Sequence, residues 1–568
     1  MSSIEALKLG SSALIAYQAA LNTTGHNIAN VSTPGYSRQR VLFQAKEPAH
    51  RGFGDVGRGV DVFSIERIAD DLLDAQLRLA TGEKERWDVL RSAFTALEGF
   101  LNGLSDYDLG DSVSRVFSAM NDVASDVENL PVRNQLIEQV RGLKDVFSNI
   151  TQRLDEAWQR LDLEIPQQAQ RINEITREIA DLNSRIVEAE SGTAGRTVAG
   201  DLRDRRGQLL SDLAKIINVH AQEDARGSIS VTAGGRPLVY ATQHYEVKAV
   251  RSETTGGFKL VYADDGSEVS VTGGSVAGVY EARDEVLARY RKWFDDYAAS
   301  IIWQINKVHS TGVGLEPRSI MQASNRVLSP TAQLKDLKFD FTPHDGVFTA
   351  ANGKLTVNVV ETATGLIHRY TVNYDLTDPL SGSPSGLVEK LDALDGISAK
   401  VDNQGRVVVQ SDTGYGLFFS EDTGGILAQL GVGGLLSGFD ARTIDLASDM
   451  DGHPEFVASG RTLLPGDNEV SLELAALNTS GKFLNTTLSL QDAYSSLIGT
   501  LGSDSLSAQD AQQNQSDIVL SLENERQEIS GVSLDEELAN LIQYQRAYQA
   551  VAKFISITDE LLDTLIKM

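Results

Sequence analysis

Cysteine is absent from this chain of 568 residues. Its absence excludes disulfides, thiolate metal sites and cysteine nucleophiles together. No uninterrupted apolar run approaches the ~20 residues that a membrane-spanning helix needs. The first residues also lack the cationic start and the apolar run of a secretory signal. We therefore expect no membrane partner, and if the protein leaves the cell, a route without a cleaved signal peptide must carry it.

Positive charge is scarce. The chain has 51 Lys and Arg against 79 Asp and Glu, which gives a net charge of −28. Such a chain repels the phosphates of nucleic acids and of anionic lipids, so we expect neither as a partner. Hydrophobic residues make up 41%, enough to bury real cores, and the length suggests about three to five domains.

Patterns of catalytic or metal-binding residues are also missing. The eight histidines are scattered, and no two have the i, i+4 spacing of a zinc-binding helix. Residues 382–386 resemble a nucleophile elbow, but Pro384 occupies the position of the nucleophile. Asp449 and Asp451 resemble part of a calcium loop whose first and twelfth ligand positions are both alanine. The sequence therefore predicts no catalytic residue, no cofactor, no metal site and no enzymatic activity.

The amino-terminal end has a helical pattern. Residues 1–30 are expected to form one helix, with Ser2 and Glu5 at capping-box spacing. Only Glu5 and Lys8 carry a full charge before Arg38. A narrow apolar stripe without a charged face suits a helix surrounded by other helices. The stripe consists of Ile4, Leu7, Leu14, Leu21 and Ile28, with Ser11, Gln18 and Gly25 at the alternate seam positions.

The carboxy-terminal end has a matching pattern. Ser533 and Glu536 form a second capping box, which predicts a last helix from Ser533 almost to the end. Heptad stripes at both ends predict either an assembly coiled coil or two core helices of one domain, and the near absence of charge in the first helix favours assembly. The carboxy-terminal stripe consists of Leu541, Tyr548, Ile555 and Leu562, with Leu538, Gln545, Ala552, Asp559 and Ile566 at the alternate positions.

The middle of the chain alternates between helical and strand-like segments. Residues 33–36 predict a type II turn, because Pro34 presets φ and Gly35 tolerates a positive φ. Pro131 and Pro166 are expected to start or break helices. Further segments are expected as follows: an extended linker with a hairpin at 37–64, helices over 65–217, strands over 218–277, a helix over 278–307, a β-rich stretch over 331–440, a loop-rich region before 490, and a helix from 490.

These segments predict an α+β multidomain fold. Terminal coiled-coil helices and a long helical bundle are built from both chain ends, and β-rich domains are inserted in the middle. The expected domains are a terminal assembly domain (1–36 and 531–568), a bundle with its linker (37–217, 278–330 and 441–530), a small β-rich subdomain (218–277) and an inserted outer β-rich domain (331–440).

The two chain ends also resemble a known family. Residues 27–39 read NIANVSTPGYSRQ, residues 530–537 read SGVSLDEE, and residues 543–548 read QYQRAY. The first resembles the amino-terminal signature, and the other two the carboxy-terminal signature, of flagellar rod, hook and hook-associated proteins. Within this family the hook-associated proteins match best. Rod proteins are short, hook proteins look β-rich soon after the first signature, and flagellin lacks it.

The resemblance implies a structural subunit of the bacterial flagellum at the junction between hook and filament. It implies an extracellular location reached through the flagellar export apparatus. The implied partners are copies of the chain in a tubular ring, the hook protein, a second junction protein or filament subunits, and an export chaperone. Together with the heptads, it places the assembly interface at Leu7, Leu14, Leu21, Ile28, Asn30, Pro34, Gly35, Tyr36, Leu538, Leu541, Tyr548, Ile555 and Leu562.

Other hypotheses remain open at this point. One is a hook or distal-rod protein. Another is a secreted adhesin whose central domain binds glycans, and a third is a hydrolase that uses carboxylates of that domain. The adhesin would need an exposed aromatic platform, whereas at strand spacing such aromatics are more often core residues. The candidates are Phe339, Phe341, Phe348, Tyr415, Phe418 and Phe419.

Overall fold

The structure is a computed structural model that describes residues 3–51, 54–101, 108–191, 199–334, 338–339, 349–378, 382–484 and 486–567. The chain forms two compact units, and each draws on separate stretches of sequence. Unit 1 comprises residues 1–92, 160–284 and 506–568, and unit 2 comprises residues 93–159 and 285–505. The fold is the expected α+β multidomain type, with long helices at the two ends and sheets in the middle.

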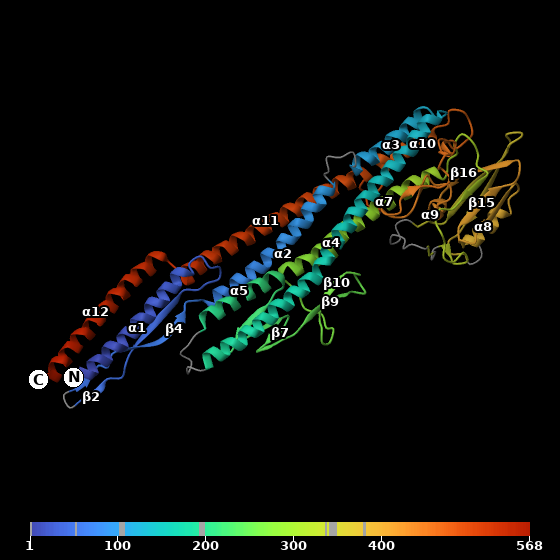
Figure 1. Cartoon of the computed structure of the whole chain (residues 1–568). Coiled ribbons are helices and arrows are strands. Elements are labelled where there is room, and N and C mark those ends of the chain that lie inside the picture. The colour runs from blue at the N-terminus through green and yellow to red at the C-terminus, as the bar shows by residue number, and fades with distance from the viewer. Residues whose placement is uncertain are drawn as a thin grey trace. The chain divides into compact units, whose positions relative to one another are not determined.

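The terminal part of unit 1 contains two helices and a hairpin. Helix α1 (Ser3–Ala29) lies beside α12 (Leu534–Lys567), and the two chain ends lie together (Figure 1). Strand β1 (Gln39–Ala45) pairs antiparallel with β4 (Val60–Arg67), and β2 (Ala49–Arg51) pairs with β3 (Gly54–Val56). The single helix and the hairpin expected for residues 1–64 are confirmed, although Ser2 lies outside the described residues.

Helices of very different lengths occur in both units. They are α2 (Asp71–Leu101), α3 (Leu109–Ser125), α4 (Leu130–Ser191), α5 (Gly200–Ile216), α6 (Gly274–Tyr280), α7 (Ala288–His309) and α11 (Leu490–Ser530). A π-helical turn, η1 (Glu281–Leu287), joins α6 to α7. Pro131 stands in the first turn of α4, as expected, whereas Pro166 lies inside this helix and does not break it. Buried Ile165, Ala169 and Ile172 anchor the helix on both sides of Pro166, so core packing outweighs the lost backbone hydrogen bond.

A small β-rich part of unit 1 packs on these helices. Its core combines apolar residues of α4 and α5 with those of the strands, including Val231, Leu238 and Leu260. The strands expected for residues 218–277 are therefore confirmed. One sheet has the order β5 (His220–Glu223), β6 (Ile229–Ala233), β7 (Arg236–Tyr240), β8 (Gln243–His244), and β9 (Val247–Arg251) pairs with β10 (Phe258–Tyr262).

The β-rich part of unit 2 contains two three-stranded sheets. One has the order β13 (Ile367–Tyr374), β12 (Gly353–Glu361), β16 (Tyr415–Asp422), and the other the order β11 (Ile320–Gln322), β15 (Val407–Ser411), β14 (Ile397–Val401). β12 with β13 and β14 with β15 form antiparallel hairpins, so the β-rich stretch expected over 331–440 is confirmed. The hydrophobic core begins before residue 331, because Val313 and Met321 belong to it. The remaining elements are α8 (Pro384–Asp392), α9 (Ile426–Leu430), β17 (Leu436–Ser437), β18 (Asp445–Leu446), the 3-10 helix η3 (Pro454–Phe456) and α10 (Glu469–Ser480).

Helix α10 corrects the expectation of a loop-rich region before residue 490. Its sequence lacks a strong apolar periodicity, yet Val470, Leu474 and Leu477 are buried. Tertiary packing therefore stabilises a helix that the local pattern alone does not indicate. The helix expected from residue 490 is confirmed as α11.

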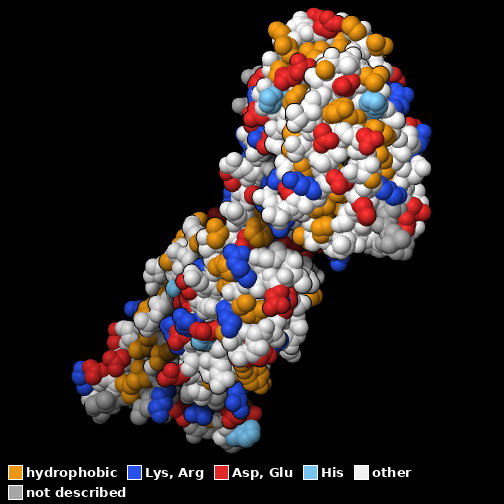
Figure 2. Space-filling view, turned by 90° about the vertical axis from the view of Figure 1, so that its right-hand side faces the viewer, with side chains coloured by type: hydrophobic (Ala, Val, Ile, Leu, Met, Phe, Trp, Pro, Cys, Tyr) orange, Lys and Arg blue, Asp and Glu red, His pale blue; other side chains and the backbone are white. Residues whose placement is uncertain are grey.

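Charged side chains are scattered over the visible surface and do not form one block (Figure 2). Acidic and basic groups are interspersed, and hydrophobic side chains show between them (Figure 2). Within the described residues, no helix is long and apolar enough to span a bilayer.

Candidate assembly site at the chain ends

The two terminal helices form an antiparallel pair. Gly10 of α1 lies against Ile555 of α12, and near the other end of the pair Asn27 bonds to Glu537. The approach at Gly10 is close, since a Cβ atom there would lie 2.6 Å from Cγ1 of Ile555. Glycine at this position therefore lets the two backbones come together.

The buried stripe of α1 consists of small and polar residues rather than leucines. Gly10, Ala13, Ala20, Thr24 and Asn27 are buried at heptad-like spacing. This differs from the expected seam, because Ser11 and Gln18 are exposed. The leucine stripe lies beside the buried stripe and stays partly exposed to solvent. Its members Leu7, Leu14, Leu21 and Ile28 are all half-buried.

Helix α12 shows the same shallow burial. Leu541, Tyr548, Ile555 and Leu562 are half-buried. The alternate seam positions are Tyr544, Val551 and Thr558, one residue before those expected, and the expected Leu538 is 48% exposed. Apolar content alone could not distinguish these registers, because both contain polar residues. Among the α12 side chains that the structure describes, only Glu537 and Thr558 are buried.

A tight turn follows α1 and directs the chain back. The Tyr36 N–H donates to the Thr33 carbonyl at 3.2 Å, and Gly35 has φ of +78°. Both features belong to a type II turn, so this prediction is confirmed. Any side chain at Gly35 would also approach Gln208 of α5, since a Cβ would lie 2.8 Å from its Oε1. Asn30 and Pro34 line the same surface, half-buried and exposed respectively.

A buried amide joins the turn to α12. Asn27 is 1% exposed, and its Nδ2 donates to Oε2 of Glu537 at 3.0 Å and to the Gln39 carbonyl at 2.9 Å. Its Oδ1 accepts the Tyr36 hydroxyl at 2.8 Å and the Gln39 N–H at 3.0 Å. Burial, followed by the nearby carboxylates Asp201, Asp204 and Glu537, raises the pKa of Tyr36, which keeps this hydroxyl a donor. Every hydrogen-bonding position of the Asn27 side chain is thus used.

Arg38 closes the same junction by pairing with the start of α12. Its Nε lies 2.7 Å from Oε1 of Glu537 and its NH2 2.8 Å from Oε1 of Glu536. The hydrogen bond to Arg38 lowers the pKa of Glu536, and that same bond is the largest influence raising the pKa of Arg38. The Arg38 N–H also donates to the Ser530 carbonyl at 2.9 Å. The predicted capping box is only half formed. The Oγ of Ser533 accepts the Glu536 N–H over a long distance of 3.5 Å, but the Glu536 side chain accepts from Arg38 and does not bond back to Ser533.

A buried carboxylate ties this junction to the bundle of unit 1. Asp204 of α5 accepts the Ser37 N–H at 3.0 Å, and its other oxygen pairs with Arg67 at 2.6 Å. Both chain ends and the bundle therefore meet around residues 27–39. We call Asn27, Tyr36, Arg38, Asp204 and Glu537 the polar clamp.

The terminal signatures contain Asn27, Tyr36, Arg38 and Glu537, but no sequence pattern predicts the roles of Asn27, Arg38, Asp204 and Glu537. Asn27 and Glu537 are separated by 510 positions. A polar residue next to an apolar stripe is ordinarily solvated, and only the fold buries these two. The signal available in the sequence was their presence inside the two terminal signatures.

Several of the residues considered for other functions make structural contacts. Asp449 pairs with Arg318 and Asp451 with Arg141, so both carboxylates have cationic partners. In the described chain, no three metal-ligating side chains come together. Of the aromatic candidates, Phe339, Phe418 and Phe419 are buried in the core of unit 2 and Tyr415 is half-buried, while Phe341 and Phe348 lie outside the described residues.

Comparison with known proteins agrees with this geometry. Residues 94–320 match the family described as "Flagellar hook-associated protein FlgK helical domain". Residues 7–36 match "Flagella basal body rod protein", and residues 523–568 match "Flagellar basal body rod FlgEFG protein C-terminal". The two rod-family matches cover most of the antiparallel pair and the turn, including Asn27, Tyr36 and Glu537 of the polar clamp, whereas Arg38 and Asp204 lie outside them.

Relatives match over almost the full length. Flagellar hook-associated protein 1 of Salmonella typhimurium is 26% identical over 98% of both chains. The protein of the same name from Bacillus subtilis is 26% identical over 98% of this chain and 96% of its own. The solved structure of the flagellar hook junction protein FlgK from Burkholderia pseudomallei is similar in fold, with a TM-score of 0.53 at 14% identity, over 80% of this chain and 100% of that one.

Proposed function

The chain belongs to the flagellar hook-associated protein 1 family, and we propose from this that its copies form the junction between the hook and the filament. It is a structural component of the bacterial flagellum, located outside the cell, and it assembles there with other flagellar components. The proposal goes further in naming the neighbours. They are copies of the chain in a tubular ring, the hook protein on one side, and a second junction protein or filament subunits on the other.

The shallow burial of the terminal helices carries this proposal. Leu7, Leu14, Leu21 and Leu562 belong to apolar stripes that the single chain leaves partly in water. Full burial of an exposed leucine contributes roughly 1.5–3 kcal/mol, and the part of this that remains for a half-buried leucine becomes available when neighbouring helices cover it. We therefore assign the assembly interface to the thirteen residues expected from the sequence, with exposed Leu538 as a position that meets a neighbour directly.

The polar clamp fits the same role. A coiled coil with little core of its own needs another device to hold its two helices in register. A buried, fully bonded Asn–Glu contact does this because any slip leaves polar groups unpaired. The clamp would thereby present the two half-buried stripes at a fixed spacing to the next subunit.

Export and chemistry complete the proposal. The chain leaves the cell through the flagellar export apparatus, with the help of an export chaperone. Its role is mechanical rather than enzymatic, in keeping with the carboxylates that are engaged in ion pairs.

Electron microscopy of cells that lack the gene tests the junction role. Hooks without filaments, together with flagellin shed into the medium, are expected. Restoring the full-length gene should restore the filaments. Cells without hooks would indicate a hook or distal-rod protein instead, and normal filaments would contradict any structural role at the junction.

A further inference from the structure

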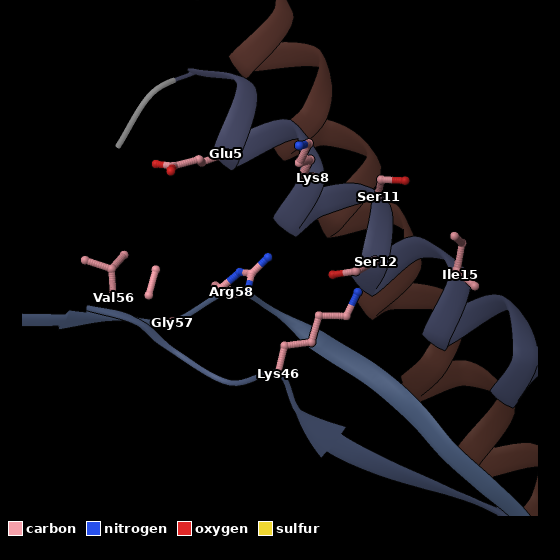
Figure 3. Close-up of a pocket in the computed structure, with 10 residues that line it drawn as sticks. Glu5, Lys8, Ser11, Ser12, Ile15, Lys46, Val56, Gly57 and Arg58 are labelled. Atoms are coloured by element: carbon pink, nitrogen blue, oxygen red, sulfur yellow. The ribbon is translucent and has the colours of Figure 1, made fainter. Parts of the chain in front are cut away.

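A recess of about 390 Å³ lies between the first half of α1 and the hairpin segment around β1 and β3 (Figure 3). Lys8 and Ser12 line it from α1, and Lys46 and Arg58 line it from the hairpin. Gly59 brings this segment against α1, since a Cβ there would lie 2.5 Å from Oγ of Ser12 and 3.5 Å from the Leu9 backbone. Glycine at this position therefore lets the segment that carries Arg58 pack closely on α1.

The recess is cationic in a strongly acidic chain. Lys8, Lys46 and Arg58 line it, against the single carboxylate of Glu5. Lys8 and Arg58 are exposed, and neither has a hydrogen bond or ion pair with a described residue. Among the described residues, Lys46 has one ion-pair partner, Asp61, at 3.9 Å. We call Lys8, Lys46 and Arg58 the cationic recess.

The opposite charge gathers on the other terminal segment. Residues 1–67 contain seven Lys or Arg against five Asp or Glu, whereas residues 506–568 contain four against eleven. Where α11 ends and α12 begins, Glu523, Glu525, Glu528 and Asp535 are exposed, and none has an ion pair with a residue in the described ranges. We call these four residues the acidic bend.

Both surfaces combine charge with uncovered apolar area. Leu520 and Leu534, beside the acidic bend, are 57% and 45% exposed. Ile15, which lines the recess, is 64% exposed. A surface that pairs charges with exposed aliphatic side chains is typical of a protein contact, because the charges select the partner and the apolar groups supply affinity.

Within one chain these two surfaces cannot meet. The hydrogen bond from Arg38 to Ser530 places the acidic bend beside the turn that follows α1. Lys8 lies near the opposite end of this helix, and the rise from Lys8 to Ala29 is roughly 30 Å at 1.5 Å per residue. Any contact between the recess and the bend must therefore join different copies, offset along α1.

We propose that the cationic recess of one copy receives the acidic bend of a second copy in the assembled flagellum. This inference rests on the proposed function, because it requires copies of the chain to be neighbours. The contact is head-to-tail, so each copy offers one recess and one bend, and the contact repeats around a ring or along a helix. It supplies the direction of assembly that the apolar stripes, which lack charge, do not encode.

Charge exchange in the full-length chain tests this. Lys8→Glu with Arg58→Glu, or Glu523→Lys with Glu525→Lys and Glu528→Lys, should each lower incorporation at the hook tip by about tenfold or more, because like charges then face each other. Combining both sets should return incorporation to within a few-fold of wild type, since the pairing is restored with its sign inverted. Secreted protein and monomer melting are measured for every variant, so that only exported, folded chains are scored.

The matched control reverses two exposed cations elsewhere in unit 1. Arg177→Glu with Arg185→Glu changes the net charge by the same amount as Lys8→Glu with Arg58→Glu, but outside the recess. This variant should incorporate normally. Equal loss in the control would show a general charge effect and would overturn the inference.

Disulfide trapping supplies a second measurement, since the natural chain has no cysteine. Arg58→Cys with Glu525→Cys should give covalent multimers of this chain in oxidised flagella and none in dilute monomer. Cross-links to a different flagellar protein, or an acidic-bend variant that assembles normally, would overturn the inference. If the wild-type gene still restores filaments to the deletion strain, the proposed function holds even when this contact between recess and bend is disproved. The two proposals can therefore fail independently.

Discussion

Asn27 and Glu537, near opposite ends of the sequence, share a buried hydrogen bond of 3.0 Å between Nδ2 and Oε2. The bond lies at one end of the antiparallel pair, where the turn after α1 meets the start of α12. It is supported by Tyr36 and Arg38, which occupy the remaining oxygen positions. The two terminal signatures are therefore in direct contact in the folded chain.

Replacing Asn27 should loosen this junction locally. In Asn27→Asp, a carboxylate oxygen replaces the amide that faces Glu537, so two negative groups meet in a buried site. The expected cost is about 1–3 kcal/mol or more, from unpaired and repelling groups. Hydrogen exchange should lose protection in residues 20–40 and 530–545 while the bundle of unit 1 stays protected.

The double variant Asn27→Asp with Glu537→Gln checks the assignment. It exchanges the carboxylate and the amide across the contact, so protection should return in part. No loss of protection in the single variant would show that the bond contributes nothing to the junction.

Gly10 and Gly25 should respond oppositely to alanine. Gly10→Ala places a Cβ 2.6 Å from Cγ1 of Ile555 and should weaken the helix pair, whereas Gly25 has no atom within 4 Å of that position. Gly25→Ala should stabilise α1 by up to about 1 kcal/mol, through helix propensity alone. Helical content of the monomer on thermal melting measures both, and adding Ile555→Ala should relieve the Gly10→Ala defect.

The chain ends should be the first segments to open in the isolated protein. Among their described side chains, α1 buries only small and polar residues, and α12 buries only Glu537 and Thr558. Such a pair has little apolar burial to offset its ordering entropy. Limited trypsin digestion should remove about 30–40 residues from each end and then stop. If α1 resisted digestion as long as the bundle, the terminal pair would be an ordinary folded domain.

Leu21 and Leu562 should matter to assembly more than to monomer stability. Both are half-buried in the single chain. Leu21→Asp and Leu562→Asp should leave calorimetric melting of the monomer near wild type, yet abolish incorporation and filament growth, because an unpaired charge would be buried in the tube. Leu21→Met and Leu562→Met are matched controls that keep volume and polarity, and they should assemble. A large fall in monomer Tm would assign these leucines to an intrachain core.

His309 should make unit 2 sensitive to acid. Its Nε2 accepts the Ala458 N–H at 3.0 Å, so its Nδ1 carries the proton that is donated to the Gly433 carbonyl at 2.9 Å. Burial first, and then the charge of Arg318, lower the pKa of His309 to about 3. The unfolded chain, with a pKa near 6.5, therefore binds the extra proton at a higher pH than the folded chain does.

Because of this difference, stability should fall as the pH drops from about 6.5 toward 3, by at most about 1.4 kcal/mol per pH unit. His309→Gln cannot be protonated, so its unfolding free energy should be lower at neutral pH but flatter over this range. Parallel pH profiles of wild type and His309→Gln would contradict the assignment. Denaturant unfolding followed between pH 4 and pH 7 provides the measurement.

The sequence by itself determined the elements that depend on local chemistry. Pro34 and Gly35 predict the type II turn because their allowed φ values match it, and alternating residues with glycine turns predict the hairpins of both β-rich parts. The terminal helices follow from heptad periodicity, and the absence of cysteine and the excess of acid exclude whole classes of site. The turn, the hairpins and the helices each depend on a few neighbouring residues, and the composition is a property of the sequence itself, so none of them needs a distant partner.

Only the tertiary structure decided which side chains become buried. It selected Gly10, Ala13 and Ala20 over the leucines of α1, because close helix approach favours small residues. It kept α4 continuous through Pro166 and formed α10 without a strong local signal, because packing outweighs propensity. It also joined Asn27 to Glu537, and separated the cationic recess from the acidic bend. These relationships depend on distances between residues far apart in sequence, and no local pattern encodes such distances.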